Sequence, residues 1–217
     1  MYTIGQSVKV RKGIKDPDTG KYDMSHWQGR ITELDTDENG EMLTGILWDS
    51  QTLKNMPQAY IKESIREGYD YGMMYLGAAD VEPAQARDAV QDSREVLEEM
   101  EDEYQWVDLG EQGERIKQVI GSEKNEYTLL NKWFTHLEKT LVFPIQGIYT
   151  GDSSRDLKHS DRITVSGMLD SDDKYGIIAF GKAGRNAIEF PLCDAQALEE
   201  TTANQSLKDY VVWFANR

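Results

Sequence analysis

Apolar and polar residues alternate along the first third of the chain, which is the pattern of short β-strands. The predicted strands are also rich in β-branched and aromatic residues. Asn39-Gly40 lies between two of them and favours a tight hairpin turn, because both residues tolerate positive φ. A helix ended by Gly68 is predicted to follow. The strands are predicted over residues 7–11, 27–34 and 42–48, and the helix over 58–67.

The middle third changes to a helical period. Apolar residues recur close to every 3.6 positions over 86–104, and acidic residues occupy the opposite face. Pro83 suits a first helical turn, with Asp80 as a cap, so the helix is predicted to begin there. Glycines then interrupt the pattern, and a shorter helical segment is predicted over 114–120.

The last third begins with a well-patterned helix and continues with strands. Leu130, Phe134, Leu137 and Leu141 follow one another at spacings of three and four, and Pro144 stops the helix. Four strands are predicted over 145–149, 162–168, 175–180 and 187–192, with residues 170–173 as the turn between the second and the third, and a closing helix over 207–215.

These elements predict an α+β protein. The strand spacing resembles that of SH3-like or Tudor-like folds, so we expect two small β-barrels joined by an acidic helical segment. The predicted boundaries are 1–79 for an SH3-like module of unknown role, 80–124 for the acidic helical linker and 125–217 for the C-terminal domain.

Charge narrows the possible partners. The 217 residues carry 39 acidic and 24 basic side chains, a net charge of −15. Residues 80–124 hold 14 of the acids and only 5 of the bases, a pattern typical of a solvated helix face. Such a chain repels phosphate backbones, which disfavours nucleic acid as a partner. Without a long apolar run or a secretion-signal pattern, we expect a cytoplasmic protein that does not bind membranes.

Residues for catalysis are scarce. The three histidines and the lone Cys193 do not have the spacing of a zinc site, and no glycine-rich phosphate loop or nucleophile motif is present. The sequence therefore predicts a protein that is not an enzyme.

Hard cations fit the composition better, because Ca²⁺ prefers several carboxylate and carbonyl oxygens on flexible loops. Residues 16–23 and 35–40 qualify by composition. The second begins like an EF-hand loop, but Ile46 stands where a bidentate Glu is required, so an EF-hand is rejected and an Asx-rich turn is favoured.

The third acidic stretch contains Asp170, Asp172 and Asp173. Three carboxylates in one turn repel one another, and a divalent ion would relieve that repulsion, although solvation and screening would also weaken it. Asp152 and Asp161 lie in the other long loop of this domain. If both loops meet at one end of the sheet, they supply enough oxygens for an ion.

Specific motifs in the last part of the chain support this interpretation. They are Trp133 with Leu137, Phe143-Pro144, the segments 161–165, 175–178 and 190–194, and Tyr210 with 213–216. Over about 90 residues this pattern resembles the CcbP-type family of small acidic bacterial proteins that bind Ca²⁺. The resemblance implies Ca²⁺ as the ion, and our candidate ligands are Asp170, Asp172, Asp173, Asp161, Asp152 and Glu138.

The leading hypothesis is therefore Ca²⁺ binding, as a buffer or a sensor. The alternative is a protein-interaction module in which Trp27, Trp48 and nearby tyrosines present an aromatic surface to a peptide, although these residues would also serve as core. The sequence does not identify a protein partner.

Overall fold

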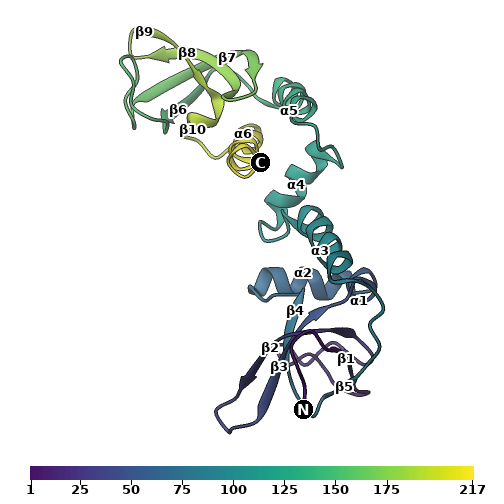
Figure 1. The fold of residues 1–217 in the computed structure, drawn as a ribbon. Coiled ribbons are helices and arrows are strands. Elements are labelled where there is room, and N and C mark those ends of the chain that lie inside the picture. The colour runs from purple at the N-terminus through teal and green to yellow at the C-terminus, as the bar shows by residue number, and fades with distance from the viewer. The chain divides into compact units, whose positions relative to one another are not determined.

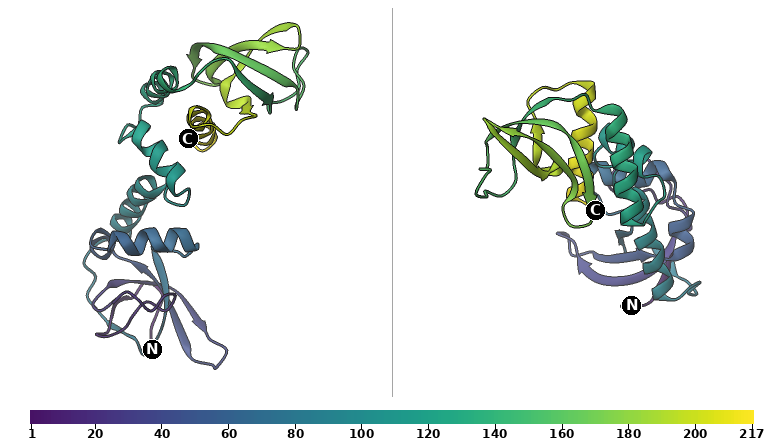
Figure 2. Two further views of the ribbon diagram at one scale, coloured as in Figure 1. Left: turned by 180° about the vertical axis from the view of Figure 1, so that it is seen from behind. Right: turned by 90° about the horizontal axis from the view of Figure 1, so that it is seen from above.

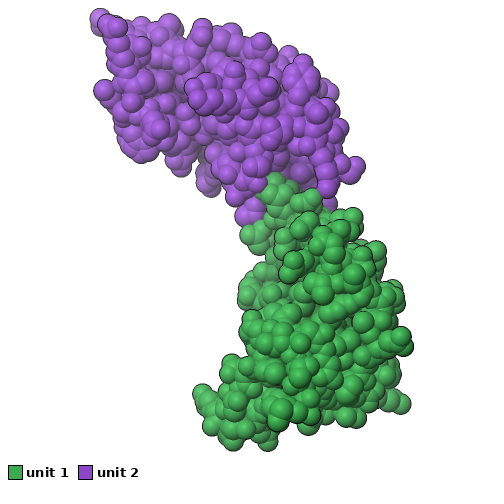
Figure 3. Space-filling model, viewed as in Figure 1, with its two compact units in different colours: residues 1–108 green, residues 109–217 purple.

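The computed structural model describes residues 1–217 and divides into two compact units, Met1–Asp108 and Leu109–Arg217 (Figure 3). Each unit combines a five-stranded antiparallel sheet with helices, which confirms the α+β class. None of the helices combines the length and the apolar character needed to cross a bilayer.

Unit 1 has the strand order β4-β3-β2-β1-β5. Its elements are β1 (Ser7–Val10), β2 (Gln28–Thr36), β3 (Met42–Trp48), α1 (Ser50–Lys54), α2 (Gln58–Glu67), β4 (Met73–Gly77), β5 (Val81–Pro83) and α3 (Val90–Tyr104) (Figure 1). The predicted strands of the first third and the helix over 58–67 are confirmed.

The β2–β3 hairpin extends past the rest of its sheet (Figure 2). Its turn is built around Asp37, whose carboxylate accepts hydrogen bonds from the amides of Asn39 and Glu41 at 2.9 and 2.8 Å. Gly40 adopts φ +83°, a conformation that few other residues accept. This acidic stretch is thus the Asx-type turn that the sequence favours.

The start of the middle helix differs from the prediction. Val81–Pro83 pairs with β1 as an edge strand, and α3 begins only at Val90. Pro83 is tolerated because an edge strand does not need every backbone N–H. The Ala89 amide instead donates to the Asp92 carboxylate at 2.8 Å, so Asp92 satisfies the first turn and Asp80 does not cap it.

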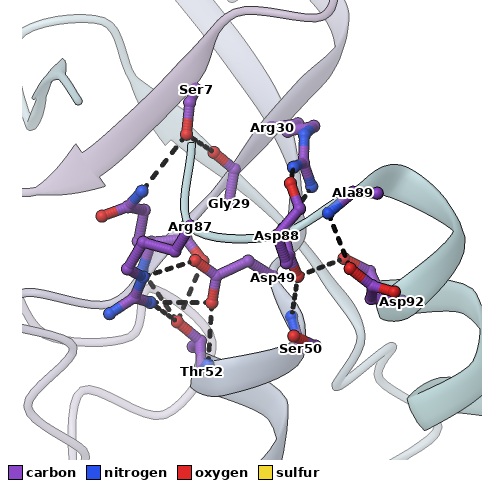
Figure 4. A network of polar contacts seen from close by, with 12 residues as sticks. Ser7, Gly29, Arg30, Asp49, Ser50, Thr52, Arg87, Asp88, Ala89 and Asp92 are labelled. Atoms are coloured by element: carbon purple, nitrogen blue, oxygen red, sulfur yellow. Dashed lines mark hydrogen bonds and ion pairs between the residues drawn. The ribbon is translucent and has the colours of Figure 1, made fainter. Parts of the chain in front are cut away.

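A polar network fixes the segment between β5 and α3 (Figure 4). Arg87 forms a two-point contact with buried Asp49, with Nε–Oδ2 at 2.8 Å and Nη2–Oδ1 at 2.7 Å. Arg30 Nη1 lies 2.7 Å from Asp88 Oδ1, and the Ser50 amide donates to Asp88 Oδ2 at 2.6 Å. Both carboxylates therefore have a cation and a backbone or hydroxyl donor nearby.

Unit 2 has the strand order β10-β6-β7-β8-β9. Its elements are α4 (Glu111–Ile120), α5 (Glu126–Thr140), β6 (Ile145–Tyr149), β7 (Arg162–Asp172), β8 (Gly176–Ala183), β9 (Asn186–Pro191), the 3₁₀ turn η1 (Leu192–Asp194), β10 (Ala195–Ala197) and α6 (Thr202–Ala215). The last predicted strands and helices are all present, with β7 longer than expected.

Aromatic residues join the helices of unit 2 to its sheet. Trp133 of α5 and Trp213 of α6 are buried with their rings 5.5 Å apart. The hydroxyl of Tyr210 accepts a hydrogen bond from the Ile177 amide of β8 at 2.8 Å. These contacts hold α5 and α6 against one face of the sheet (Figure 1).

Helix α4 is tied to α6 by a buried acid. The Asp209 carboxylate faces Arg115, with Nε–Oδ2 at 2.7 Å and Nη2–Oδ1 at 3.1 Å. Gln112 and Gln205 each donate to Asp209 Oδ1 at 3.1 Å. The segment 80–124, predicted as one acidic linker, thus contributes β5 and α3 to unit 1 and α4 to unit 2.

The two predicted barrels are not confirmed, because both sheets are open. In unit 1 the edge strands are β4 and β5, and in unit 2 they are β10 and β9; neither pair is hydrogen-bonded to the other. Helices packed on the sheets provide the burial that strand closure would otherwise supply.

Candidate metal-binding site

The end of β6 and the turn η1 are joined by backbone and side-chain hydrogen bonds. The carbonyl of Asp194 accepts from the Thr150 amide at 2.7 Å and from the Thr150 hydroxyl at 3.0 Å. Because both donors belong to one residue, η1 is held firmly beside the loop that follows β6. This contact places the Asp194 side chain over the start of that loop.

Asp194 and Asp152 form a like-charged pair in unit 2. Burial, and then the negative charge of Asp152, raise the pKa of Asp194, while the Tyr149 hydroxyl partly opposes the rise. Burial and the charges of Asp194 and Asp152 likewise raise the pKa of Tyr149. No Arg or Lys is paired with Asp194 in the structure, so the like-charge repulsion is uncompensated.

Gly151 makes this close approach possible. A Cβ atom at residue 151 would lie 2.5 Å from Tyr149 Oη and 2.6 Å from Asp194 Cγ, which is closer than non-bonded atoms approach. A side chain there would push the Asp194 carboxylate away. The absence of a side chain at residue 151 therefore lets the Asp194 carboxylate and the Tyr149 hydroxyl lie against the loop, with Asp152 close enough to raise the pKa of Asp194.

Backbone carbonyl oxygens of the loop contact neighbouring side chains. The ring nitrogen Nδ1 of His159 lies 3.1 Å from the Thr150 carbonyl and 3.4 Å from the Gly151 carbonyl. The Tyr149 hydroxyl donates to the Asp152 carbonyl at 3.1 Å. We define the Asp152–Asp194 site as Tyr149, Thr150, Gly151, Asp152 and Asp194.

Cys193, next to Asp194, has no reactive character. Burial, and then the charge of Asp194, raise the pKa of its thiol to about 12. A thiol of this kind stays protonated at neutral pH and is a poor nucleophile and a poor metal ligand. Its sulfur lies 4.0 Å from the Tyr175 carbonyl, so η1 also contacts the turn between β7 and β8.

Two of the three predicted ligands in this hairpin, Asp170 and Asp172, accept hydrogen bonds from neighbouring backbone amides. Asp170 and Asp172 belong to β7 itself, opposite Ile178 and Gly176, and only Asp173 lies in the turn. The Asp172 carboxylate accepts from the amides of Lys174 and Tyr175 at 2.8 and 2.9 Å. The prediction placed all of 170–173 in the turn; the strand is longer because its backbone pairing continues almost to the tip.

The other predicted ligands are dispersed. The Asp161 carboxylate accepts from the Lys158 amide at 2.8 Å. Glu138 is exposed on α5. No group of three or more His, Cys, Asp or Glu side chains is arranged to hold a metal ion. Of the six predicted ligands, Asp152 alone is placed near a carboxylate whose pKa it raises, that of Asp194.

Asp194 was missed by the sequence analysis. It follows a proline and two apolar residues, so it is expected only as the end of a strand. The one available signal was its place in the family-like segment 190–194. Its proximity to Asp152 depends on the contact between η1 and β6, which links residues more than 40 positions apart.

The acidic stretch 16–23 of unit 1 is structural. Asp16 is buried, and its carboxylate accepts from the amides of Thr19 and Tyr22 at 2.8 and 2.9 Å. Burial alone would raise the pKa of Asp16, but these hydrogen bonds outweigh it and lower the value. The oxygens are therefore already satisfied by the chain.

The aromatic residues proposed as a peptide surface lie largely in the core. Trp48 and Tyr60 are buried, and the ring of half-buried Trp27 packs edge-on against both, at 5.4 and 5.3 Å between centroids. These contacts support the second of the two roles considered from the sequence, which is packing in the core.

The Asp152–Asp194 site has the types of ligand that a hard cation prefers, but too few of them to replace all of its bound water. It offers two carboxylates and nearby carbonyl oxygens, which are the ligand types of Ca²⁺, but fewer than the six to eight oxygens that Ca²⁺ requires. Water would have to supply the remainder. The site is thus chemically suited to Ca²⁺ and is not a complete protein cage.

Known proteins resemble the second half of the chain. Residues 114–214 match the model of the CcbP family, whose description is calcium binding. Two solved structures are similar, one described as the crystal structure of Anabaena CcbP and one as a calcium binding protein in the calcium-binding form. Both are 21% identical and cover 48% of this chain, with 89% and 90% of their own lengths and TM-scores of 0.40 and 0.38. A search of curated proteins found no match.

The family match confirms the resemblance predicted from the C-terminal motifs and supports Ca²⁺ as the ion. It begins at residue 114, inside α4, and so includes the helix that Asp209 holds against α6. The family description concerns ion binding and not catalysis.

Proposed function

We propose that the unit formed by residues 109–217, most of which matches the calcium-binding CcbP family, binds Ca²⁺ at the Asp152–Asp194 site. The proposal rests on the calcium-binding family match over residues 114–214 and on the half-buried Asp194 carboxylate, which lies against Gly151 and Tyr149 with Asp152 close enough to raise its pKa. A divalent ion between the two carboxylates would remove their repulsion, so the folded unit gains stability when it binds.

The ion would be held by the two carboxylates, with Tyr149 and the loop carbonyls around it. Because the protein supplies few ligands, we infer a dissociation constant on the order of 10⁻⁴ M, at the weak end of protein Ca²⁺ sites. Mg²⁺ would bind less well, since it demands a regular octahedral shell and loses water reluctantly. The hairpin residues Asp170, Asp172 and Asp173 remain a second candidate position for an ion.

The test is thermal unfolding and calorimetry of the full chain with Ca²⁺ and Mg²⁺. Wild type should show a rise in melting temperature at about 5 mM Ca²⁺, because the ligand binds only the folded state. Asp194→Asn and Asp152→Asn should each remove most of that rise. Asp194→Asn should also raise the melting temperature without Ca²⁺, because it removes a charge that burial disfavours.

Two further variants test whether Ca²⁺ binding depends on the position of the Asp194 carboxylate or on the total negative charge of unit 2. Gly151→Ala keeps both carboxylates but displaces that of Asp194, so it should weaken Ca²⁺ binding without changing the net charge. The triple variant Asp170→Asn, Asp172→Asn, Asp173→Asn removes more charge elsewhere in the unit and should leave the Ca²⁺ response largely intact. Loss of the response in the triple variant alone would move the site to the hairpin, and no response in wild type would refute Ca²⁺ binding.

The role as buffer or sensor depends on whether the fold responds to the ion. The Thr150–Asp194 hydrogen bonds already hold the site together, so we infer a small rearrangement and a buffering role. Hydrogen exchange with and without Ca²⁺ should show protection confined to residues near 149–161 and 192–194. Protection that spreads into α5 and α6 would instead indicate a sensor.

A further inference from the structure

An open surface groove of about 500 Å³ lies between α4 and α5 in unit 2. The residues of α5 that line it are spaced by three and four, so they form one continuous stripe of the helix. The lining residues are Gln118, Val119, Thr128, Asn131, Lys132, Thr135, His136 and Lys139. A stripe that faces another helix is normally apolar, and here seven of the eight residues are polar.

Several hydrogen-bond donors line the groove. The side chains of Gln118, Asn131 and Lys139 are exposed to solvent, and the His136 ring packs edge-on against Trp133 at 5.7 Å between centroids. Lys132 donates to the Ile120 carbonyl at 2.7 Å and keeps two further N–H groups. The groove therefore has donors available for a ligand that supplies acceptors.

Positive charge gathers here in a strongly acidic chain. None of the eight lining residues is acidic, and two are lysines. Burial lowers the pKa of His136, an effect opposed by Asp209 and reinforced by Lys139. Asp209 lies on α6 and is paired with Arg115, while Glu123, which precedes α5, lies near Lys132. The net charge of the groove is thus positive, and its acidic neighbours lie outside the lining.

We propose that this groove binds a small doubly charged oxyanion of the phosphate type, held by Lys139, Lys132 and His136, with Asn131 as an additional donor. Phosphate oxygens accept several strong hydrogen bonds from such groups. The groove is separate from the Asp152–Asp194 site and does not depend on Ca²⁺ binding.

The test is titration of the full chain with inorganic phosphate and, separately, glycerol phosphate, without divalent ions. The ring signals of His136 should shift in NMR, and its pKa should rise when the anion binds. Lys139→Gln should weaken binding about tenfold, the loss expected for one charge-assisted hydrogen bond. Tighter binding of the ester than of the free anion would indicate that the groove also holds an organic group.

Lys182→Gln is the matched control, because Lys182 is exposed on β8 outside the groove and the charge change is identical. It should alter binding by less than about twofold if screening weakens distant charges. Equal losses in both lysine variants would show diffuse attraction and overturn the proposal. No His136 shift at about 20 mM phosphate would also overturn it, because the groove would then be only a hydrated contact between helices.

Discussion

The two units treat their buried carboxylates differently. In unit 1, Asp49 faces Arg87 and Asp88 faces Arg30, while Asp16 is satisfied by amides. In unit 2, Asp209 has Arg115, but Asp194 has only a phenol and a second carboxylate. A compensated carboxylate contributes to the fold, whereas an uncompensated one lowers stability until a cation arrives. Asp18 of unit 1 also has a raised pKa, through burial and the charge of Asp16, but its side chain is exposed, whereas Asp194 is half-buried. Half-burial beside a second carboxylate is therefore what distinguishes Asp194.

The largest effect is expected when a compensated pair of unit 1 is broken. Arg30→Ala leaves Asp88 buried without its cation, and such losses cost about 3 kcal/mol. Urea unfolding of the full chain should show this drop. Lys9→Ala, which breaks the exposed pair with Glu82, is the control and should have a far smaller effect. Similar losses in both would contradict the assignment of Asp88 to a buried pair.

A smaller effect is expected from the compensated pair of unit 2. Arg115→Met keeps part of the packing but leaves Asp209 with two glutamine donors, at a cost of about 1–3 kcal/mol. Hydrogen exchange should then rise in α4 before it rises in α5 or the sheet. If α4 stays protected, the ion pair is not what holds it.

The pH dependence should separate the two classes of carboxylate. The pKa of Asp194 is raised above 3.8, so its protonated form favours the folded state, and that contribution is lost as pH rises through the folded value. The pKa of Asp88 is lowered, because hydrogen bonds from Ser50, Arg30 and Ser93 outweigh burial. The stability from Asp88 is therefore present above pH 3.8 and is lost as pH falls through its folded value.

Melting temperatures between pH 7 and pH 3 provide the measurement. The difference between Asp194→Asn and wild type should shrink as the pH falls through the raised pKa of Asp194, because the wild-type carboxyl is then neutral. Asp88→Asn should differ most from wild type near neutral pH and least at the acidic end, with the opposite sign. If the melting temperatures of the two variants changed with pH in the same way, the proposed difference between Asp194 and Asp88 would be wrong.

The smallest effect concerns the hairpin of unit 2. Replacing Asp170 with Asn should change stability little, because this carboxylate is exposed and accepts only the amide of the next residue. Calorimetry with Ca²⁺ should give the same affinity as wild type. If Asp170→Asn bound Ca²⁺ more weakly than wild type, Asp170 would again be a candidate ligand.

Local sequence patterns predicted an element well where its hydrophobic period and its helix- or strand-breaking residues agreed. The helix over 58–67 and the strand over 145–149 match the structure at both ends, because period and breakers agreed there. The helix start predicted at Pro83 was wrong, because proline suits both the first turn of a helix and an edge strand. Only the pairing of this segment with β1 decides between the two. The site was predicted less well, since Asp152 meets Asp194 through a contact between distant segments that no spacing encodes.

The ion pair between α4 and α6 also sets how the second half of the chain can be separated from the first. A fragment that begins at residue 125 would lose Arg115 and Gln112 together and leave Asp209 buried beside a glutamine alone. We therefore expect a fragment that starts near residue 109 to be more stable than one that starts at residue 125, because it keeps both partners of Asp209 on α4.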